Sequence, residues 1–434
     1  MRNLAFVLLL GAVFEAAFGQ NQPVAFLGAR IIDGTGASPV AGGVLIVRQG
    51  KIEAVGPAGK VRIPAGAARV DLAGKTIMPG LINAHGHVGE TKGLRSGAQF
   101  YTEENLLSQL KLYAAYGVTT VWSLGGDTEL AMKLRDAQST PDLKRARIYA
   151  AGPVVVGDTP EAARKMVDQI AAMKADIVKI RVDDNLGAGR KMPKPVYESV
   201  LDQARRHGLR VAAHIFYLDD AKSLLDGGAG FIAHSVRDKE VDAGIIAMLK
   251  KRDVCVCPTL TREVSTFVYE STPDFFRDPF FLRHADGGVL RELQDAKRQQ
   301  SVRESKSAQQ YKLALEMASR NLKKLVDSGV RIAFGTDTGP PARFQGYFEH
   351  MELQLMAKAG LTPMQILKSA TGDAARCMNL ARQVGTLEPG AWADFLVLGS
   401  NPLDDIRNTR TLESVWIAGN RVEIPASTGA PAGN

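Results

Sequence analysis

The chain has 434 residues, of which 45% are hydrophobic and 23% are charged, and its formal net charge at pH 7 is +8. This composition is typical of a globular protein and excludes collagen-like, low-complexity and intrinsically disordered chains. The basic residues are scattered rather than gathered in runs, so the sequence predicts no nucleic-acid partner.

Residues 1–19 predict a secretory signal peptide. Arg2 precedes an apolar run, residues 4–14, which is too short to anchor the protein in a bilayer. The small residues Ala17 and Gly19 end the segment and suit cleavage. We therefore predict an exported protein without a stable membrane anchor, periplasmic if the source is a Gram-negative bacterium.

Short alternating apolar segments with Gly and Pro turns occupy both ends of the mature chain, in residues 20–76 and 383–424. Such segments are typical of small β domains. Because chain termini often lie close together, we predict one composite β-sandwich domain built from both ends. Residues 425–434 are small and polar, and we predict a disordered tail.

Between these ends, residues 77–382 alternate short β-branched runs with helical stretches. Eight such runs predict an α/β fold, a (β/α)8 TIM barrel, with a doubly wound sheet as the alternative. No glycine-rich dinucleotide fingerprint follows the first run, which disfavours that alternative. The connection around residues 262–310 is far longer than a βα unit needs and is rich in Phe, so we predict a lid.

Polar residues stand where several of the predicted strands end. His85 and His87 are two apart, so their side chains lie on one face of a strand. His214, His234 and Asp337 end three further strands. Active sites of barrels form at the carboxyl ends of the strands, so we predict that these side chains converge. Taken singly, each histidine is compatible with a satisfied core position, and Asp337 with a helix cap.

Lys179 lies inside the apolar run "DIVKIRV", where an unpaired ammonium carries a heavy burial cost. The three cysteines do not make a disulfide framework. Cys255 and Cys257 are neighbours two apart on one predicted strand and are poorly placed to bridge each other. We interpret them as small buried hydrophobic residues, with metal ligation as the alternative.

The chain resembles the amidohydrolase superfamily of metal-dependent hydrolases, and most of all its imidazolonepropionase-like group, which includes Xaa-Pro dipeptidases. The resemblance rests on "MPGLINAHGH", "VKI", "AAH", "IAHS", "FGTDT" and the closing "VGTLEPGAWADFLVL". It implies two divalent metal ions, with zinc favoured by imidazole and carboxylate ligands, although manganese and cobalt tolerate them too. The metal ligands that it implies are His85, His87, Lys179, His214, His234 and Asp337.

Within this set, the resemblance implies that Lys179 is carboxylated by CO2 and bridges both metals. A hydroxide shared by the metals would attack the carbonyl, and Asp337 would act as the catalytic proton carrier. Tyr217 would stabilise the developing oxyanion. We predict that Arg181, Arg237 and Tyr217 bind the substrate, the arginines by gripping a carboxylate.

The sequence therefore predicts a binuclear amidohydrolase acting on a small-molecule amide, such as a dipeptide or an N-acyl amino acid. A cyclic amidase or imidazolone hydrolase, a lactonase, and a metal- or solute-binding barrel without catalysis are the alternatives. Members of the imidazolonepropionase type use one metal and lack the bridging lysine. The resemblance also implies a homo-oligomer.

Overall fold

The computed structural model describes residues 22–423. The predicted signal peptide, residues 1–19, and the predicted disordered tail, residues 425–434, lie outside the described residues. In the described part, no helix combines the length and the apolar character needed to cross a membrane.

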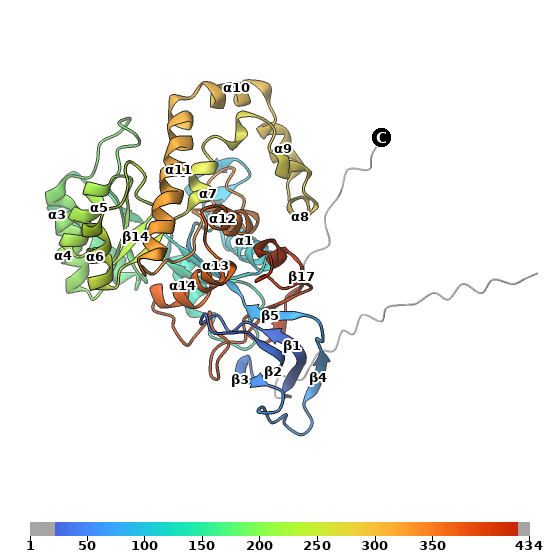
Figure 1. The fold of residues 1–434 in the computed structure, drawn as a ribbon. Helices are drawn as coiled ribbons and strands as arrows, with labels where there is room; N and C mark the ends of the chain where they lie inside the picture. Colours follow the sequence, from blue (N-terminus) through green and yellow to red (C-terminus); the bar gives the residue numbers. More distant parts are fainter. Residues whose placement is uncertain (1–21, 424–434) are drawn as a thin grey trace, which may run out of the picture.

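One eight-stranded sheet combines strands from both ends of the chain, in the order β18-β17-β16-β5-β1-β2-β3, with β4 also paired to β1. Figure 1 shows the C-terminal strands, in red, beside the N-terminal strands, in blue. The strands of this sheet are β1 Val24–Ile31, β2 Val40–Arg48, β3 Lys51–Pro57, β4 Ala68–Asp71, β5 Thr76–Pro79, β16 Phe395–Leu398, β17 Leu412–Ile417 and β18 Asn420–Arg421.

The structure has one continuous sheet here, where the sequence predicts the two sheets of a β-sandwich. The reason lies in β1, which pairs with β4 over Val24–Leu27 and with β5 at Arg30 and Ile31. Bulges between these two stretches bend the strand. A bent sheet can cover its own core, and Phe26 packs edge-on against both Phe395 and Trp416.

The parallel strands of residues 81–257 form two sheets, ordered β10-β9-β6 and β11-β12-β13-β14-β15. Residues 331–338 connect them, because Ile332 bridges to Val256 of β15 and Thr338 bridges to Gly86 of β6. The parallel strands are β6 Leu81–Gly86, β9 Val118–Ser123, β10 Arg147–Ala150, β11 Val154–Val155, β12 Val178–Arg181, β13 Val211–His214, β14 Phe231–Ala233 and β15 Cys255–Cys257; a small hairpin consists of β7 Thr91–Lys92 and β8 Arg95–Ser96.

Helices alternate with these strands and begin at well-defined caps. Thr159 accepts a hydrogen bond from Ala162 at the start of α3, and Thr362 forms a capping box with Gln365 at the start of α13. The helices are α1 Glu103–Ala115, α2 Glu129–Asp136, α3 Pro160–Ala172, α4 Lys194–Arg206, α5 Leu218–Gly227, α6 Ala243–Arg252, α7 Leu260–Val264, α8 Pro279–Leu282, α9 Gly287–Leu293, α10 Ala296–Glu304, α11 Lys306–Asp327, α12 Tyr347–Lys358, α13 Pro363–Ser369 and α14 Gly372–Cys377.

The insertion predicted around residues 262–310 consists mainly of short helices, α7 to α10. In Figure 1, α8, α9 and α10 lie at the end of the molecule opposite β1 to β4. The insertion is held by specific contacts. The Asp278 carboxylate accepts hydrogen bonds from Tyr347, at 2.9 Å, and from Arg410, and the Tyr116 hydroxyl donates to the carbonyl of Phe280 at 3.1 Å. Its aromatic side chains are thus packed onto the rest of the molecule.

A disulfide joins Cys255 of β15 to Cys377 of α14, which corrects the interpretation of Cys255 as a small buried hydrophobic residue. Cys255 and Cys257 do not bridge each other, and Cys257 remains a buried free thiol. The partner of Cys255 lies 122 residues further along the chain. Spacing could not reveal this pair, because only the packing of α14 against β15 brings the two sulfur atoms together.

Removing this disulfide is expected to destabilise the protein substantially. A cross-link that closes a loop of this length restricts the unfolded chain, and such links contribute about 2–4 kcal/mol to the free energy of unfolding. We expect a Cys255→Ala/Cys377→Ala variant to lose this amount in urea unfolding, and Cys257→Ala to lose less. Equal losses of unfolding free energy in the two variants would show that the stability depends on the volume of the cysteine side chains rather than on the cross-link.

Candidate metal centre

Three predicted ligands form one compact group at the carboxyl ends of the parallel strands. The ligand atoms of His85, His87 and Asp337 all lie within 4.8 Å of one another. Asp337 Oδ1 is 2.9 Å from Nε2 of His87 and 3.4 Å from Nε2 of His85. His85 is the next-to-last residue of β6, and Asp337 lies near the end of the segment paired beside it, so neighbouring strands present the two side chains to the same point.

A second pair of imidazoles lies beside this group. His214, the last residue of β13, and His234, directly after β14, face each other with Nδ1 of His214 2.8 Å from Nε2 of His234. The rings of His234 and His85 are 4.6 Å apart between centroids, so the two groups are adjacent. All five side chains predicted as imidazole or carboxylate ligands are therefore brought together.

The outward-facing nitrogens of three histidines have hydrogen-bond acceptors. Nδ1 of His87 donates to the carbonyl of Gly125 at 3.1 Å, Nε2 of His214 donates to Asp183 at 2.7 Å, and Nδ1 of His234 contacts the Thr259 hydroxyl at 2.6 Å. With a proton on each of these atoms, the inward nitrogens carry lone pairs. Such acceptors fix the tautomer of metal-ligating histidines.

The resulting arrangement fits metal ions well. Nδ1 of His214 and Nε2 of His234 lie 2.8 Å apart, and Nε2 of His87 lies 2.9 Å from a carboxylate oxygen of Asp337. With the outer nitrogens protonated, the lone pairs of these inner atoms are directed to places where a cation can bind. Nitrogen and oxygen donors of this kind suit divalent ions such as zinc.

Lys179 lies between the two groups. It sits in β12 with only 4% of its surface exposed, and its ammonium nitrogen is 3.3 Å from Nε2 of His85. Burial lowers the pKa of Lys179 to about 8, so the neutral amine is far more accessible than in water. The buried amine therefore contacts the imidazole of His85 and lies within the field of the Asp337 carboxylate, so it belongs to the same group of polar side chains.

Electrostatics keep the site in the state that metal binding requires. Burial lowers the pKa of His214 to about 3 and holds the pKa values of His85 and His234 well below their usual value. Although burial opposes it, the neighbouring Arg343 and His85 hold the pKa of Asp337 well below its usual range. His85, His214 and His234 are therefore neutral and Asp337 is ionised at neutral pH, as ligands must be.

Backbone conformation at the site is uncommon. His234, Asp337 and Thr259 are non-glycine residues with φ values of 74°, 59° and 51°, in the left-handed region. Such conformations carry a cost for most side chains and cluster at functional sites. Here they turn two ligand side chains inward just where their strands end.

The predicted substrate-binding residues lie in different surroundings. Arg181 is 46% exposed in its side chain and donates to Asn185 at 2.7 Å. Arg237 has no exposed side-chain surface; its guanidinium lies 3.0 Å from Glu263 and donates to two backbone carbonyls. The structure thus places Arg237 inside the wall of the site rather than at its mouth. The Tyr217 hydroxyl donates to Asp184 at 2.8 Å.

Three residues of the site were missed by sequence reasoning: Asp183, Arg343 and Glu352. Arg343 forms an ion pair with Asp337, and Asp183 holds His214. The adjacent aspartates 183 and 184, directly after the predicted strand that bears Lys179, were the one available signal. Nothing in the local sequence connects Arg343 or Glu352 with the ligands.

Glu352 supports the site from α12. Its carboxylate accepts hydrogen bonds from the backbone of Leu260 at 2.7 Å and of Thr261 at 2.6 Å, at the start of α7. The N-cap residue of α7 is Thr259, whose side chain makes no capping bond because it contacts His234 instead. Glu352 therefore satisfies the free helix N–H groups and leaves Thr259 available for the histidine.

The Asp183→Asn variant is expected to bind metal at the His214–His234 pair about 10- to 100-fold more weakly, because the amide is a poorer acceptor for the His214 N–H. Competitive metal titration against a chromogenic chelator measures this affinity. Asp184→Asn is a matched control, since Asp184 contacts Tyr217 and not a histidine. Equal affinities in both variants would show that Asp183 does not orient its histidine.

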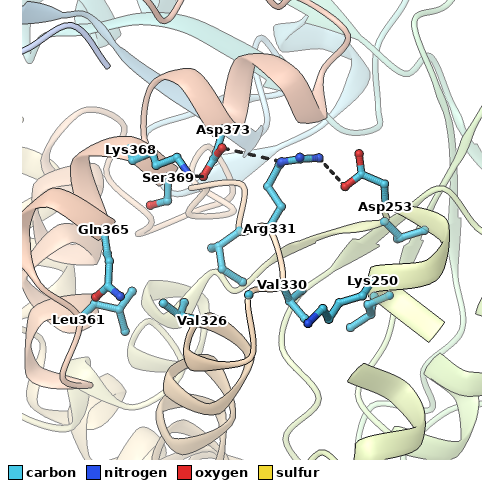
Figure 2. Close-up of a pocket in the computed structure, with 14 residues that line it drawn as sticks. Lys250, Asp253, Val326, Val330, Arg331, Leu361, Gln365, Lys368, Ser369 and Asp373 are labelled. Carbon is cyan, nitrogen blue, oxygen red and sulfur yellow. Dashed lines mark hydrogen bonds and ion pairs between the residues drawn. The ribbon is translucent and has the colours of Figure 1, made fainter. Parts of the chain in front are cut away.

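A cavity of about 360 Å³ lies elsewhere, among α6, α11, α13 and α14. Figure 2 shows Arg331 between Asp253, at 2.5 Å, and Asp373, at 3.7 Å, with Lys368 on the other side of Asp373 at 3.3 Å. Asp253 and Arg331 precede their strand segments, so this cavity opens at the amino ends of the strands. None of the metal-centre residues lines it, and four of its charged residues pair with one another.

The amidohydrolase family model matches residues 76–422 of this chain. The chain belongs to the amidohydrolase family. It is accordingly a hydrolase of carbon–nitrogen bonds, and members of the family generally use divalent metal ions. The group formed by His85, His87 and Asp337 could hold such an ion.

Comparison with individual proteins shows which kinds of amidohydrolase this chain is similar to. The imidazolonepropionase of Geobacillus kaustophilus is 22% identical over 82% of this chain and 84% of its own length. That of Deinococcus deserti is 36% identical, but the match spans only 26% of its length. A Bifidobacterium longum protein named as a prolidase has 25% identity and a TM-score of 0.74, covering 95% of this chain and 97% of its own. A Xaa-Pro dipeptidase with bound methionine also has a TM-score of 0.74, at 20% identity, over 93% and 100%.

This amidohydrolase is therefore similar both to imidazolonepropionases and to prolidase-like proteins. The fold likeness extends over nearly all of the described chain, including the composite sheet. The predicted membership of the imidazolonepropionase-like and Xaa-Pro dipeptidase-like group is confirmed.

Proposed function

We propose that this amidohydrolase is an exported binuclear enzyme that hydrolyses the amide bond of dipeptides or N-acyl amino acids. The observation that carries the proposal is the convergence of two pairs of inward-facing donor atoms with a buried lysine between them. His87 and Asp337 form one pair, and His214 and His234 form the other. A single metal ion would occupy only one of these two pairs of donor atoms.

The fold supports this reading. Ala84 donates to the carbonyl of Phe334 at 2.8 Å, and Ala333 donates to that of Val256 at 2.9 Å. Residues 331–338 therefore bond to β6 on one side and to β15 on the other. If β10 and the two-residue β11 that follows it are counted as one interrupted strand, we infer that this segment is the eighth strand of a closed (β/α)8 barrel, with the metal centre at its carboxyl end.

Lys179 is proposed as the bridging ligand. Its neutral amine would add to CO2, forming an N–C bond and releasing one proton, which turns a buried cation into a carboxylate. An anion at this place fits between two groups of neutral imidazoles that bind cations. The pKa of Lys179, lowered to about 8 by burial, favours the amine form that reacts.

The side chains of the site have distinct roles. Two bound divalent ions, with zinc favoured by the donor set, supply an activated water and polarise the substrate carbonyl. Asp337 lies at the centre of the group and is ionised, so it can take a proton from the attacking water and pass it to the leaving amine. Tyr217 lies just beyond His214, and its hydroxyl would have to turn from Asp184 to donate to the developing oxyanion.

An imidazolone or other cyclic amide hydrolase is the second candidate, because the relatives from Geobacillus and Deinococcus are imidazolonepropionases. The same chemistry at a ring amide, or at a lactone, would use the same residues. The buried Lys179 and the second histidine pair favour the binuclear reading. Export is supported by the Cys255–Cys377 disulfide, since such bonds are typical of oxidising compartments.

Metal analysis combined with a substrate screen tests the proposal. Purified enzyme reconstituted with zinc and bicarbonate is expected to hold about two ions per chain and to release amino acids from a library of dipeptides and N-acyl amino acids. A chelated sample serves as the control. One ion per chain, or hydrolysis of imidazolonepropionate alone, would contradict the proposal.

A further inference from the structure

Arg343 lies on the loop between residues 331–338 and α12, at the mouth of the site. Its backbone closes a tight turn, because its N–H donates to the carbonyl of Pro340 at 3.0 Å and its own carbonyl accepts from Gly339 at 3.1 Å. Gly339 in turn lies directly against the backbone of His87. The loop is thus fixed to the strand ends that bear the metal ligands.

The guanidinium of Arg343 is held at two points and free at a third. Nη1 donates to the carboxylate of Asp337, and Nε donates to the Ser265 hydroxyl at 3.1 Å. Among the described residues, Nη2 has no hydrogen-bond partner, and 19% of the side chain is exposed. A partly desolvated guanidinium with one free donor edge is suited to bind an anion that enters from solvent.

We propose that Arg343 recognises the free carboxylate of the amino acid that leaves, and so restricts this enzyme to substrates with a C-terminal carboxylate. The inference rests on the proposed function. In a dipeptide or N-acyl amino acid, this carboxylate lies only a few bonds from the scissile carbonyl. Arg343 is separated from the metal centre by a similarly short distance, because it contacts Asp337, whose carboxylate lies 2.9 Å from His87.

The other candidate arginines satisfy these conditions less well. Arg237 is buried and donates to the carbonyls of Ile215 and Ser235. Arg181 is half exposed and bonds to Asn185. Arg343 alone among the three combines partial exposure with direct contact to a residue of the metal centre. It also stands at the inner edge of the aromatic insertion, through Ser265 at the end of α7.

A pair of matched substrates separates recognition from a mere effect on Asp337. The best N-acetyl-L-amino acid of the screen and its carboxamide differ only in the charge that Arg343 would bind. In the Arg343→Gln variant we expect kcat/KM for the acid to fall about 100-fold or more, mainly through KM, while kcat/KM for the carboxamide changes far less. Arg343→Lys should keep part of the preference for the acid over the carboxamide, because lysine retains the positive charge but lacks the paired N–H donors of a guanidinium.

Control variants and a binding measurement complete the test. Arg277→Gln, at an 83% exposed side chain, should leave the acid-to-carboxamide ratio unchanged. Calorimetry with the free amino acid product should show the same loss of affinity in Arg343→Gln. If Arg343→Gln does not fold, the partial loss in Arg343→Lys carries the comparison.

Several outcomes would overturn the inference. An equal loss on both substrates would show that Arg343 acts only on Asp337, and a loss of the ratio in Arg181→Gln instead would assign the role to Arg181. Failure of the metal-loaded wild-type enzyme to hydrolyse either substrate would overturn the proposed function together with this inference. Hydrolysis of both without preference for the acid would overturn this inference alone.

Discussion

The Asp337→Asn variant is expected to lose on the order of 10³-fold in kcat while keeping most of its metal. The amide preserves the shape of the side chain and one oxygen donor, but it cannot accept a proton. Asp337 is 6% exposed, and its carboxylate contacts both His87 and Arg343. Steady-state kinetics and metal analysis of the same preparation measure both quantities.

The control for this variant is Asp373→Asn, at the cavity on the opposite side of the strands. It removes a comparably buried carboxylate that has no part in the metal centre, and kcat should be preserved. Normal activity in Asp337→Asn would contradict its role as proton carrier. A complete loss of metal in that variant would make its role as a ligand sufficient to explain the defect.

The Lys179→Met variant is expected to lose about half of its bound metal and about 100-fold or more in kcat/KM. Methionine has a similar volume but no amine, so it cannot form a carbamate. The folded state should be at least as stable as the wild type, because an amine that is 4% exposed is replaced by an apolar group. Metal analysis, kinetics and urea unfolding together distinguish a lost ligand from a damaged fold.

A dependence on CO2 provides an independent check of Lys179. Reconstitution of the chelated enzyme in CO2-free buffer should restore less activity than reconstitution with bicarbonate. Lys368→Met, at a half-exposed lysine far from the centre, should reconstitute like the wild type. If Lys179→Met binds two ions per chain and keeps full activity, Lys179 does not bridge the metals and is only a buried structural residue.

Much of the metal centre could be predicted from local sequence. The two-residue spacing of His85 and His87 places both side chains on one face of a strand, whatever the rest of the fold. His214, His234 and Asp337 follow apolar runs short enough to be buried strands. The carboxyl ends of parallel strands meet at one edge, so the approximate convergence of these residues follows from periodicity and chain order.

The surroundings of the ligands could not be predicted in this way. Glu352 acts on α7 from 91 and 92 residues further along the chain, and Cys377 reaches Cys255 across 122 residues. Periodicity assigns a side chain to a face, but it does not say which residue of a distant element lies opposite. The same limit explains Arg237, which was predicted to bind the substrate carboxylate although its neighbours bury it.

The amino-acid sequence alone therefore determined the family, the alternation of strands and helices, and the six side chains proposed to hold metal. Only the tertiary structure decided which acceptors fix the histidine tautomers, that Arg343 rather than Arg237 stands beside Asp337, and that the composite sheet is one bent sheet. The physical reason is that ligand positions depend on strand periodicity, which is local. Hydrogen-bond partners, ion pairs and the disulfide depend on the packing of elements that are distant in the chain.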